Sequence, residues 1–266
     1  MPTSEPTIPQ LFDLRGRVAL LTGGAGHLGS AMSRALAEAG ASVVVTSRTT
    51  ERAREATEAL PQVGDARHYG VALDHMEAES IEAGFAETRA VAGRVDILIN
   101  NGNEAVSADW TTVTPEQFNR QLANATGYFL LSRLVRDHVV SRGGGASIVM
   151  IGSMYGQVAS YPDAYAGVGP ASPVGYHALK GGIIHMTRHL AAYWAADGVR
   201  VNCLSPGPFP SEKAHPEMVE RLCGKLPMRR MGEPWELKGA IVFLAGDASS
   251  FVTGQNLTVD GGWTAW

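Results

Sequence analysis

Short apolar runs that alternate with helix-like stretches constrain the fold of this chain more than any other feature. The runs have the length and residue types of strands, and they lie at residues 18–22, 42–47, 68–74, 95–100, 146–151, 199–204 and 256–259. Most stretches between them are rich in Ala, Glu, Arg and Leu, as in SAMSRALAEAG and ERAREATEAL. Several runs are almost continuously apolar, which is typical of parallel strands covered on both faces. The pattern predicts an α/β fold: a doubly wound, mostly parallel, seven-stranded sheet with helices on both faces.

Length and composition favour one domain. The chain has 266 residues, enough to bury the core of one large α/β domain. Apolar residues make up 45% of it and charged residues 18%, so a globular fold is expected rather than disorder. No linker, repeat or low-complexity tract divides the sequence. We therefore predict a loose N-terminal arm at residues 1–12 and a single domain at residues 13–266.

Charge and cysteine content narrow the expected partners and compartment. The net charge is −4 with no basic block, whereas nucleic-acid-binding domains usually carry a stripe of Lys and Arg. Two cysteines, Cys203 and Cys223, are too few for a disulfide framework and fit a reducing compartment. The N-terminus lacks the blocks of a signal peptide, and no apolar run approaches the ~20 residues of a membrane span. We expect a cytoplasmic protein with no nucleic-acid, membrane or metal partner.

A glycine-rich turn, TGGAGHLG at residues 22–29, follows the first predicted strand and precedes a predicted helix. Gly23, Gly26 and Gly29 are spaced three apart. In a doubly wound sheet, one glycine makes the tight turn, a second lets the backbone approach a pyrophosphate, and a third lets helix pack on strand. The helix N-terminus presents free N–H groups to the anion. Glycine clusters also form ordinary loops, but this position predicts a dinucleotide site.

A tyrosine and a lysine lie four residues apart in GYHALKGG, residues 175–182. On a helix, Tyr176 and Lys180 share a face. A nearby ammonium favours the phenolate and lowers its pKa from the ordinary ~10, which would make Tyr176 an acid or base at neutral pH. The alternative is an amphipathic surface helix, because this spacing is common by chance.

Taken with further motifs, these features resemble the short-chain dehydrogenase/reductase family along nearly the whole chain. The motifs occur in the family's order, and besides the glycine turn and YHALK they are NNGN (100–103), NATGYF (124–129), IGS (151–153), SPGPFPS (205–211) and FVTGQNLTVDGGW (251–263). The resemblance implies a Rossmann-type fold and an NAD(P)-dependent oxidoreductase acting on a carbonyl or secondary alcohol (EC 1.1.1.-).

The resemblance also implies site residues. Tyr176 corresponds to the family's proton donor or acceptor, and Lys180 to the residue that holds the nicotinamide ribose and lowers the tyrosine pKa. Ser153 would hydrogen-bond the substrate oxygen, and Asn124 would anchor a water that links Lys180 to solvent. The alternatives are structural roles without a part in catalysis: Ser153 would cap a strand end, and Asn124 would be a solvent-facing residue of a helix. The resemblance places these further residues at the cofactor: Leu28, Asp74, Asn100, Gly102, Pro206, Gly207 and Phe209.

Two motifs depart from the family's usual form. His27 stands at a position that is glycine in the classical members, and the spacing Gly-x-x-Gly-x-x-Gly is that of the extended members. We expect His27 either to point away from the cofactor or to cap its phosphates. Asn103 replaces the glycine of the usual Asn-Asn-Ala-Gly, and asparagine tolerates a left-handed backbone better than most residues.

The end of the second predicted strand bears on cofactor choice. An NAD site usually places Asp or Glu there to bind the ribose 2′-OH. The sequence VVVTSRTTER has no acid before Glu51. Arg48 would instead bind a 2′-phosphate, with Thr46 or Ser47 assisting. NADP(H) is favoured and NAD(H) remains the alternative, since Arg48 would equally suit a solvated loop.

The segment between Ser153 and Tyr176 bears on the substrate. It has 22 residues, about ten more than in typical members, and contains Tyr155, Tyr161, Asp163 and Tyr165. Such a loop would cover the pocket and offer hydroxyl and carboxylate partners to a polyhydroxylated substrate, with Tyr155, Ser153 and Tyr176 in contact with it. This resembles the sugar- and sugar-acid-type members, including gluconate 5-dehydrogenases. The alternatives are a 3-oxoacyl thioester reductase, a loop used only in oligomer packing, and a non-catalytic dinucleotide sensor.

Association into a homodimer or homotetramer is implied by the resemblance. Family members usually pair through the helices that carry Asn124 and Tyr176, and Gly181 and Gly182 would permit close helix approach. The C-terminal GGWTAW leaves Trp263 and Trp266 without a local core partner in the sequence, so we expect them to pack against a neighbouring subunit.

Overall fold

Seven parallel strands form one sheet in the order β3-β2-β1-β4-β5-β6-β7. The structure is a computed structural model that describes residues 5–169, 172–212 and 214–265. The strands are β1 (Val18–Leu21), β2 (Ser42–Ser47), β3 (Tyr69–Ala72), β4 (Ile97–Asn100), β5 (Ala146–Ile151), β6 (Val199–Pro206) and β7 (Asn256–Val259). The predicted doubly wound sheet is confirmed, and every strand pair is parallel rather than most of them.

The strand order reverses direction beside β1. The chain proceeds outward from β1 to β3 and then returns to place β4 on the other side of β1. In open α/β sheets, ligands bind beyond the carboxyl ends of the strands at such a reversal. The glycine turn follows β1 directly, so the sheet topology places it at this position.

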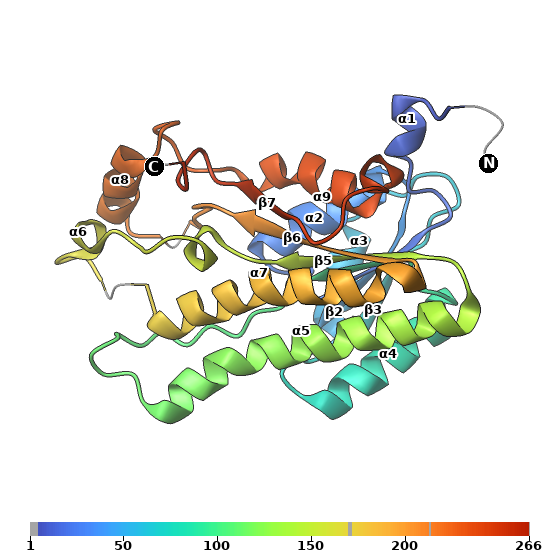
Figure 1. Cartoon of the computed structure of the whole chain (residues 1–266), viewed down its shortest axis with the longest axis horizontal. Coiled ribbons are helices and arrows are strands. Elements are labelled where there is room, and N and C mark those ends of the chain that lie inside the picture. The colour runs from blue at the N-terminus through green and yellow to red at the C-terminus, as the bar shows by residue number, and fades with distance from the viewer. Residues whose placement is uncertain (1–4, 170–171, 213, 266) are drawn as a thin grey trace.

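Two helical layers cover the sheet (Figure 1). On one face lie α4 (Ala78–Ala92), α5 (Pro115–Arg142) and α7 (Val174–Trp194), and on the other lie α2 (His27–Glu38) and α9 (Lys238–Ala245). Successive residues of a strand pack in two different hydrophobic cores. Leu20 packs beneath α4, α5 and α7, and Leu21 packs beneath α2 and α9. Because both faces are buried, the strands are apolar at almost every position. Helix α3 (Thr50–Glu58) packs on the edge strand β3 and on its neighbour β2.

A third, smaller cluster lies beyond the carboxyl ends of the strands. The segment between Ser153 and Tyr176 forms a 3₁₀ turn, η1 (Met154–Gly156), and a short helix, α6 (Pro162–Tyr165). Both pack with α8 (Pro216–Lys225) and with the end of the chain, on one side of the molecule in Figure 1.

Trp263 belongs to this cluster, and the expectation that it packs against a neighbouring subunit is wrong, because its partners lie in its own chain. Its side chain is buried, with the rings of Tyr161 and Tyr155 edge-on at 5.1 and 6.2 Å. The partners come from the inserted segment, which lies about a hundred residues away in sequence and folds back over the C-terminal strand. Trp266 lies outside the described residues.

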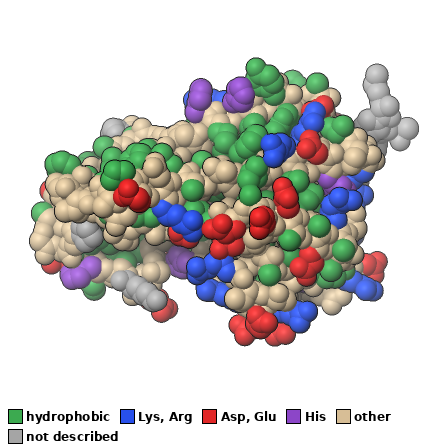
Figure 2. Space-filling view, turned by 90° about the horizontal axis from the view of Figure 1, so that it is seen from below, with side chains coloured by type: hydrophobic (Ala, Val, Ile, Leu, Met, Phe, Trp, Pro, Cys, Tyr) green, Lys and Arg blue, Asp and Glu red, His purple; other side chains and the backbone are tan. Residues whose placement is uncertain are grey.

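The remaining elements are short. They are α1 (Ile8–Leu11) in the predicted N-terminal arm and the 3₁₀ turns η2 (Ala195–Asp197), η3 (Pro234–Leu237) and η4 (Asp247–Ser249). None of the described helices has the length and apolarity needed to cross a membrane. Acidic and basic side chains are interspersed on the face seen from below (Figure 2).

Candidate active site

The glycine turn is shaped by close backbone contacts. Gly23 has a φ of 63°, in the left-handed region that favours glycine. A Cβ atom at Gly29 would lie 2.2 Å from the carbonyl oxygen of Gly23, so only glycine lets α2 pack this closely on the turn. The Asn101 side-chain amide donates to the carbonyl oxygens of Thr22 and Gly23 at 3.0 and 3.1 Å, which ties the turn to the loop after β4.

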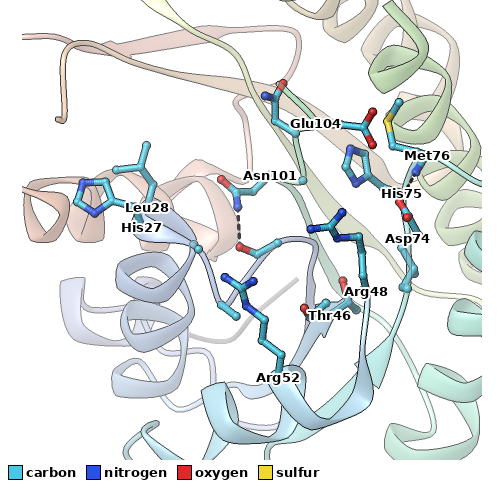
Figure 3. Close-up of a pocket in the computed structure, with 18 of the residues that line it drawn as sticks. His27, Leu28, Thr46, Arg48, Arg52, Asp74, His75, Met76, Asn101 and Glu104 are labelled. Atoms are coloured by element: carbon cyan, nitrogen blue, oxygen red, sulfur yellow. Dashed lines mark hydrogen bonds between the residues drawn. The ribbon is translucent and has the colours of Figure 1, made fainter. Parts of the chain in front are cut away.

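The N-terminus of α2 faces outward from this turn. Its N-cap is Gly26, which has no side chain to bond the first-turn amides. Uncapped amides and the helix dipole suit an anion such as a pyrophosphate. His27 begins the helix and is exposed, and Figure 3 shows its ring directed away from Arg48 and Arg52. His27 nevertheless lines the cleft described next, so its orientation toward the cofactor phosphates stays a prediction.

A cleft of about 450 Å³ extends from the turn along the carboxyl ends of β1 to β4. Of the predicted cofactor residues it is lined by Gly23, Gly26, His27, Leu28, Gly29, Ser47, Arg48, Asp74 and Gly102. These glycines and uncapped amides fit the phosphates of a dinucleotide, so the residues present fit the implied cofactor.

Two arginines project into this cleft. Arg48 follows β2, and Arg52 lies in the first turn of α3; both side chains line the cleft (Figure 3). No ion pair within the described chain engages either guanidinium. Arg52 was not among the predicted site residues. The sequence offered a signal for Arg52, because it is a second arginine four residues after Arg48 in TSRTTER.

Asn100 does not line the cleft. Its side chain is buried and donates to the carbonyl of Tyr128 and to Ser132 Oγ at 3.2 and 2.8 Å, which joins β4 to α5. The neighbouring Asn101, which binds the glycine turn, lies in the cleft instead. Strand pleating explains the difference, since adjacent residues at a strand end point to opposite faces.

A second pocket of about 380 Å³ adjoins the cleft at Ala105, which lines both. Ser153, Tyr155 and Tyr176 line it, together with Gly207 and Phe209 from the segment after β6. Pro206, the last residue of β6, lies behind this wall and is buried. The structure thus brings the predicted serine and tyrosine together beside the cleft.

Lys180 lies one helical turn from Tyr176 and almost entirely below the surface. Its side chain is 3% exposed, and its Nζ donates to the Ile151 carbonyl at 2.7 Å. The same Nζ lies 5.5 Å from the centre of the Tyr176 ring. Tyr176 and Lys180 therefore share a helix face, as their spacing predicts.

Burial controls the pKa values of this pair. It raises the pKa of Tyr176, and the Ser153 hydroxyl opposes that shift only in part. It also lowers the pKa of Lys180 to about 8. The expectation that the ammonium brings the Tyr176 pKa below its ordinary value is therefore not met in the protein alone, because desolvation of the phenolate outweighs the attraction.

Asn124 is fully buried in α5, and protein groups occupy its side-chain amide. Its Oδ1 accepts from the Glu104 backbone N–H at 2.7 Å and bonds His75 Nε2 at 2.8 Å. Its Nδ2 donates to the carbonyls of Glu104 and Gln121. The side chain holds the loop after β4, so a bound water at this residue would need another of its atoms.

Comparisons with known proteins place this geometry in context. A family model described as enoyl-(acyl carrier protein) reductase matches residues 23–264. Galactitol 2-dehydrogenase (L-tagatose-forming) of Cereibacter sphaeroides is 37% identical over 96% of this chain and 98% of its own. Acetoacetyl-CoA reductase of Shinella zoogloeoides is 34% identical, and the match covers 92% of this chain and 98% of that protein.

A solved structure agrees with these relatives. It is that of gluconate 5-dehydrogenase from Burkholderia cenocepacia J2315 in complex with NADP and tartrate. It superposes with a TM-score of 0.84 and 31% identity, covering 97% of this chain and 99% of that one.

Proposed function

The chain belongs to the short-chain dehydrogenase/reductase family, and we propose that it transfers hydride between NADP(H) and the carbinol or carbonyl carbon of a polyol or sugar. It is an NAD(P)-dependent oxidoreductase. One observation carries the proposal: the pocket lined by Ser153 and Tyr176 opens beside the dinucleotide cleft, with Lys180 buried behind the tyrosine.

The proposed roles follow from these positions. The nicotinamide, when bound, supplies the carbon that accepts or donates hydride. Tyr176 takes the hydroxyl proton during oxidation and returns it during reduction. Ser153 orients the substrate oxygen toward Tyr176. Lys180 holds a charge behind the ring that favours the phenolate, and its contact with the Ile151 carbonyl fixes the ammonium in place.

The relatives support a polyol or sugar substrate, since galactitol 2-dehydrogenase is similar along almost the whole chain. A 3-oxoacyl thioester is the second candidate. Acetoacetyl-CoA reductase is also similar, and one wall of the pocket is apolar, with Met218, Val219 and Leu222 from α8. A non-catalytic sensor is disfavoured because the serine, tyrosine and lysine are all present, with Ser153 and Tyr176 lining one pocket and Lys180 buried behind the tyrosine.

A substrate screen tests the proposal. Purified protein is incubated with alditols, ketoses, sugar acids and 3-oxoacyl thioesters, and the absorbance of the reduced nicotinamide is followed with each cofactor. Turnover of an alditol or ketose is expected. Turnover of thioesters alone would establish the second candidate instead.

Arg48→Ala is expected to lower kcat/KM for NADP(H) about 10- to 100-fold and to leave that for NAD(H) nearly unchanged. Charge-assisted hydrogen bonds to a 2′-phosphate are worth about 1.5–3 kcal/mol, which corresponds to this range. Arg52→Ala should act in the same direction. Steady-state kinetics with both cofactors measure the ratio.

Arg54→Ala is the control for this prediction. Arg54 lies on α3 close to Arg48 in sequence, is exposed, and does not line the cleft, so its replacement removes the same charge. If Arg48→Ala and Arg54→Ala have the same effect on the cofactor ratio, the assignment of a 2′-phosphate site is wrong.

We also propose a cytoplasmic homodimer or homotetramer, the form implied by the family. The paired helices α5 and α7 carry exposed apolar side chains, Val140 and Tyr193, that would suit an interface. Sedimentation of a monomer at micromolar concentration would contradict association.

A further inference from the structure

Two tyrosine hydroxyls meet on the wall of the substrate pocket. The Oη atoms of Tyr155 and Tyr165 lie 2.7 Å apart, and both residues line the pocket that contains Ser153 and Tyr176. Tyr155 comes from η1, directly after β5, whereas Tyr165 ends α6 in the inserted segment. The fold of the insert therefore brings the second hydroxyl back to the first.

Both rings are held in place. Tyr155 stacks on His177 with ring centres 4.7 Å apart and has Trp263 at its edge. Tyr165 is positioned by α6, which is joined to α8 through the ion pair between Asp163 and Lys225. Burial raises the pKa of Tyr155, so its hydroxyl stays protonated at neutral pH.

The hydroxyls of Tyr155 and Tyr165 can make further hydrogen bonds besides the one between them. When one tyrosine donates to the other, one O–H and several lone pairs remain for a ligand. The neighbouring polar groups are more fully used: Gln121 binds the Val106 N–H through Oε1, and the Ser172 hydroxyl binds His177. A substrate hydroxyl, which both donates and accepts, matches what the tyrosine pair offers.

The described residues of this wall are uncharged. Among the described residues that line the pocket there is no Lys, Arg, His, Asp or Glu. The nearest cations of α8 are engaged elsewhere, Lys225 with Asp163 and Arg221 with Glu217. A substrate carboxylate desolvated against these described residues would have no compensating ion pair with them, which is costly.

We propose that the Tyr155–Tyr165 hydroxyl pair recognises a second hydroxyl of the substrate, and that the pocket selects uncharged polyols and ketoses over sugar acids. The inference rests on the proposed function and narrows its substrate class. Tyr155 and Tyr165 determine specificity, and Ser153 and Tyr176 act on the reacting carbinol.

Tyr165→Phe tests the pair because it removes one hydroxyl and keeps the ring. We expect kcat/KM for an alditol such as galactitol to fall about tenfold, mainly through KM. Turnover of 2-butanol, which has no second hydroxyl, should be unchanged. Tyr155→Phe should give a similar loss, and the double variant should be little worse than either single one because the two hydroxyls act as a unit.

Tyr161→Phe is the matched control. Tyr161 lies in the same insert, but it packs on Trp263 and does not line the pocket. Its alditol kinetics should equal those of the wild type, and thermal unfolding of each variant shows whether the insert is still folded. Equal kinetics for Tyr165→Phe and Tyr161→Phe would overturn the role of the pair.

The charge selectivity is tested with the wild-type protein. The kcat/KM for an alditol should exceed that for the aldonate of the same chain length by about tenfold or more. An aldonate that reacts as well as the alditol would overturn the selectivity while leaving the oxidoreductase proposal intact. Absence of turnover with every secondary alcohol and ketone would overturn both.

Discussion

Tyr176→Phe is expected to lower kcat/KM for alcohol oxidation about 10³-fold and to leave NADP(H) affinity within a few-fold of the wild type. The variant removes only the hydroxyl that exchanges a proton with the substrate, and such proton transfer contributes about 10²–10⁴-fold. The ring, which packs with Met154 and Tyr155, is retained. Steady-state kinetics and titration of cofactor fluorescence measure the two quantities separately.

The control is Tyr161→Phe, a tyrosine that packs on Trp263 outside the pocket and should have no effect. The pH profile adds a second readout. Burial raises the pKa of Tyr176, so the phenolate needed for oxidation becomes more abundant as pH rises, and wild-type oxidation should accelerate with pH up to about 8, where Lys180 begins to lose the charge that favours the phenolate. Unchanged turnover in Tyr176→Phe would refute the mechanism.

Lys180→Met should lower turnover about 100-fold and at the same time raise the free energy of unfolding near pH 7. Burial lowers the pKa of Lys180 from 10.5 to about 8. Below pH 8 the folded and unfolded states both bind the proton, and the folded state bears the full cost of the buried charge, about 3 kcal/mol. Methionine has a similar length and no charge, so the variant should gain stability relative to the wild type near pH 7.

The gain should disappear as pH rises. Between pH 8 and 10.5 the folded wild type has lost the proton while the unfolded chain still binds it, so wild-type stability increases. Loss of the bond to the Ile151 carbonyl reduces the gain by a similar amount at every pH. Urea unfolding of both proteins at pH 7 and pH 10 measures the difference, and Lys238→Met, at an ion pair with Glu38 on the surface, is the control. A stability difference that does not change with pH would contradict the buried charge.

Local patterns predicted much of the fold and part of the site. The strands could be predicted because both faces of the sheet are buried. The glycine turn could be predicted because Gly23 and Gly29 meet a steric demand that no other residue satisfies. Tyr176 and Lys180 were readable as a pair because one helical turn separates them.

Features that depend on long-range packing were not readable. Trp263 was expected to lack partners because the insert that covers it is distant in sequence. Asn100 was predicted at the cofactor from the resemblance, and the sequence does not show that its side chain turns toward α5 while that of Asn101 turns toward the glycine turn. The direction of the Tyr176 pKa depends on how deeply the ring is buried, which spacing alone does not reveal.

The two residues that act on the reacting carbinol, Ser153 and Tyr176, flank the inserted segment. Ser153 follows β5 and Tyr176 lies in α7, so both belong to the framework, whereas Tyr165 and α6 belong to the segment between them. Divergence within residues 154–175 would therefore alter which molecules are accepted without rebuilding the machinery that moves hydride and proton. Among proteins with this architecture, substrate specificity can therefore change through this one segment.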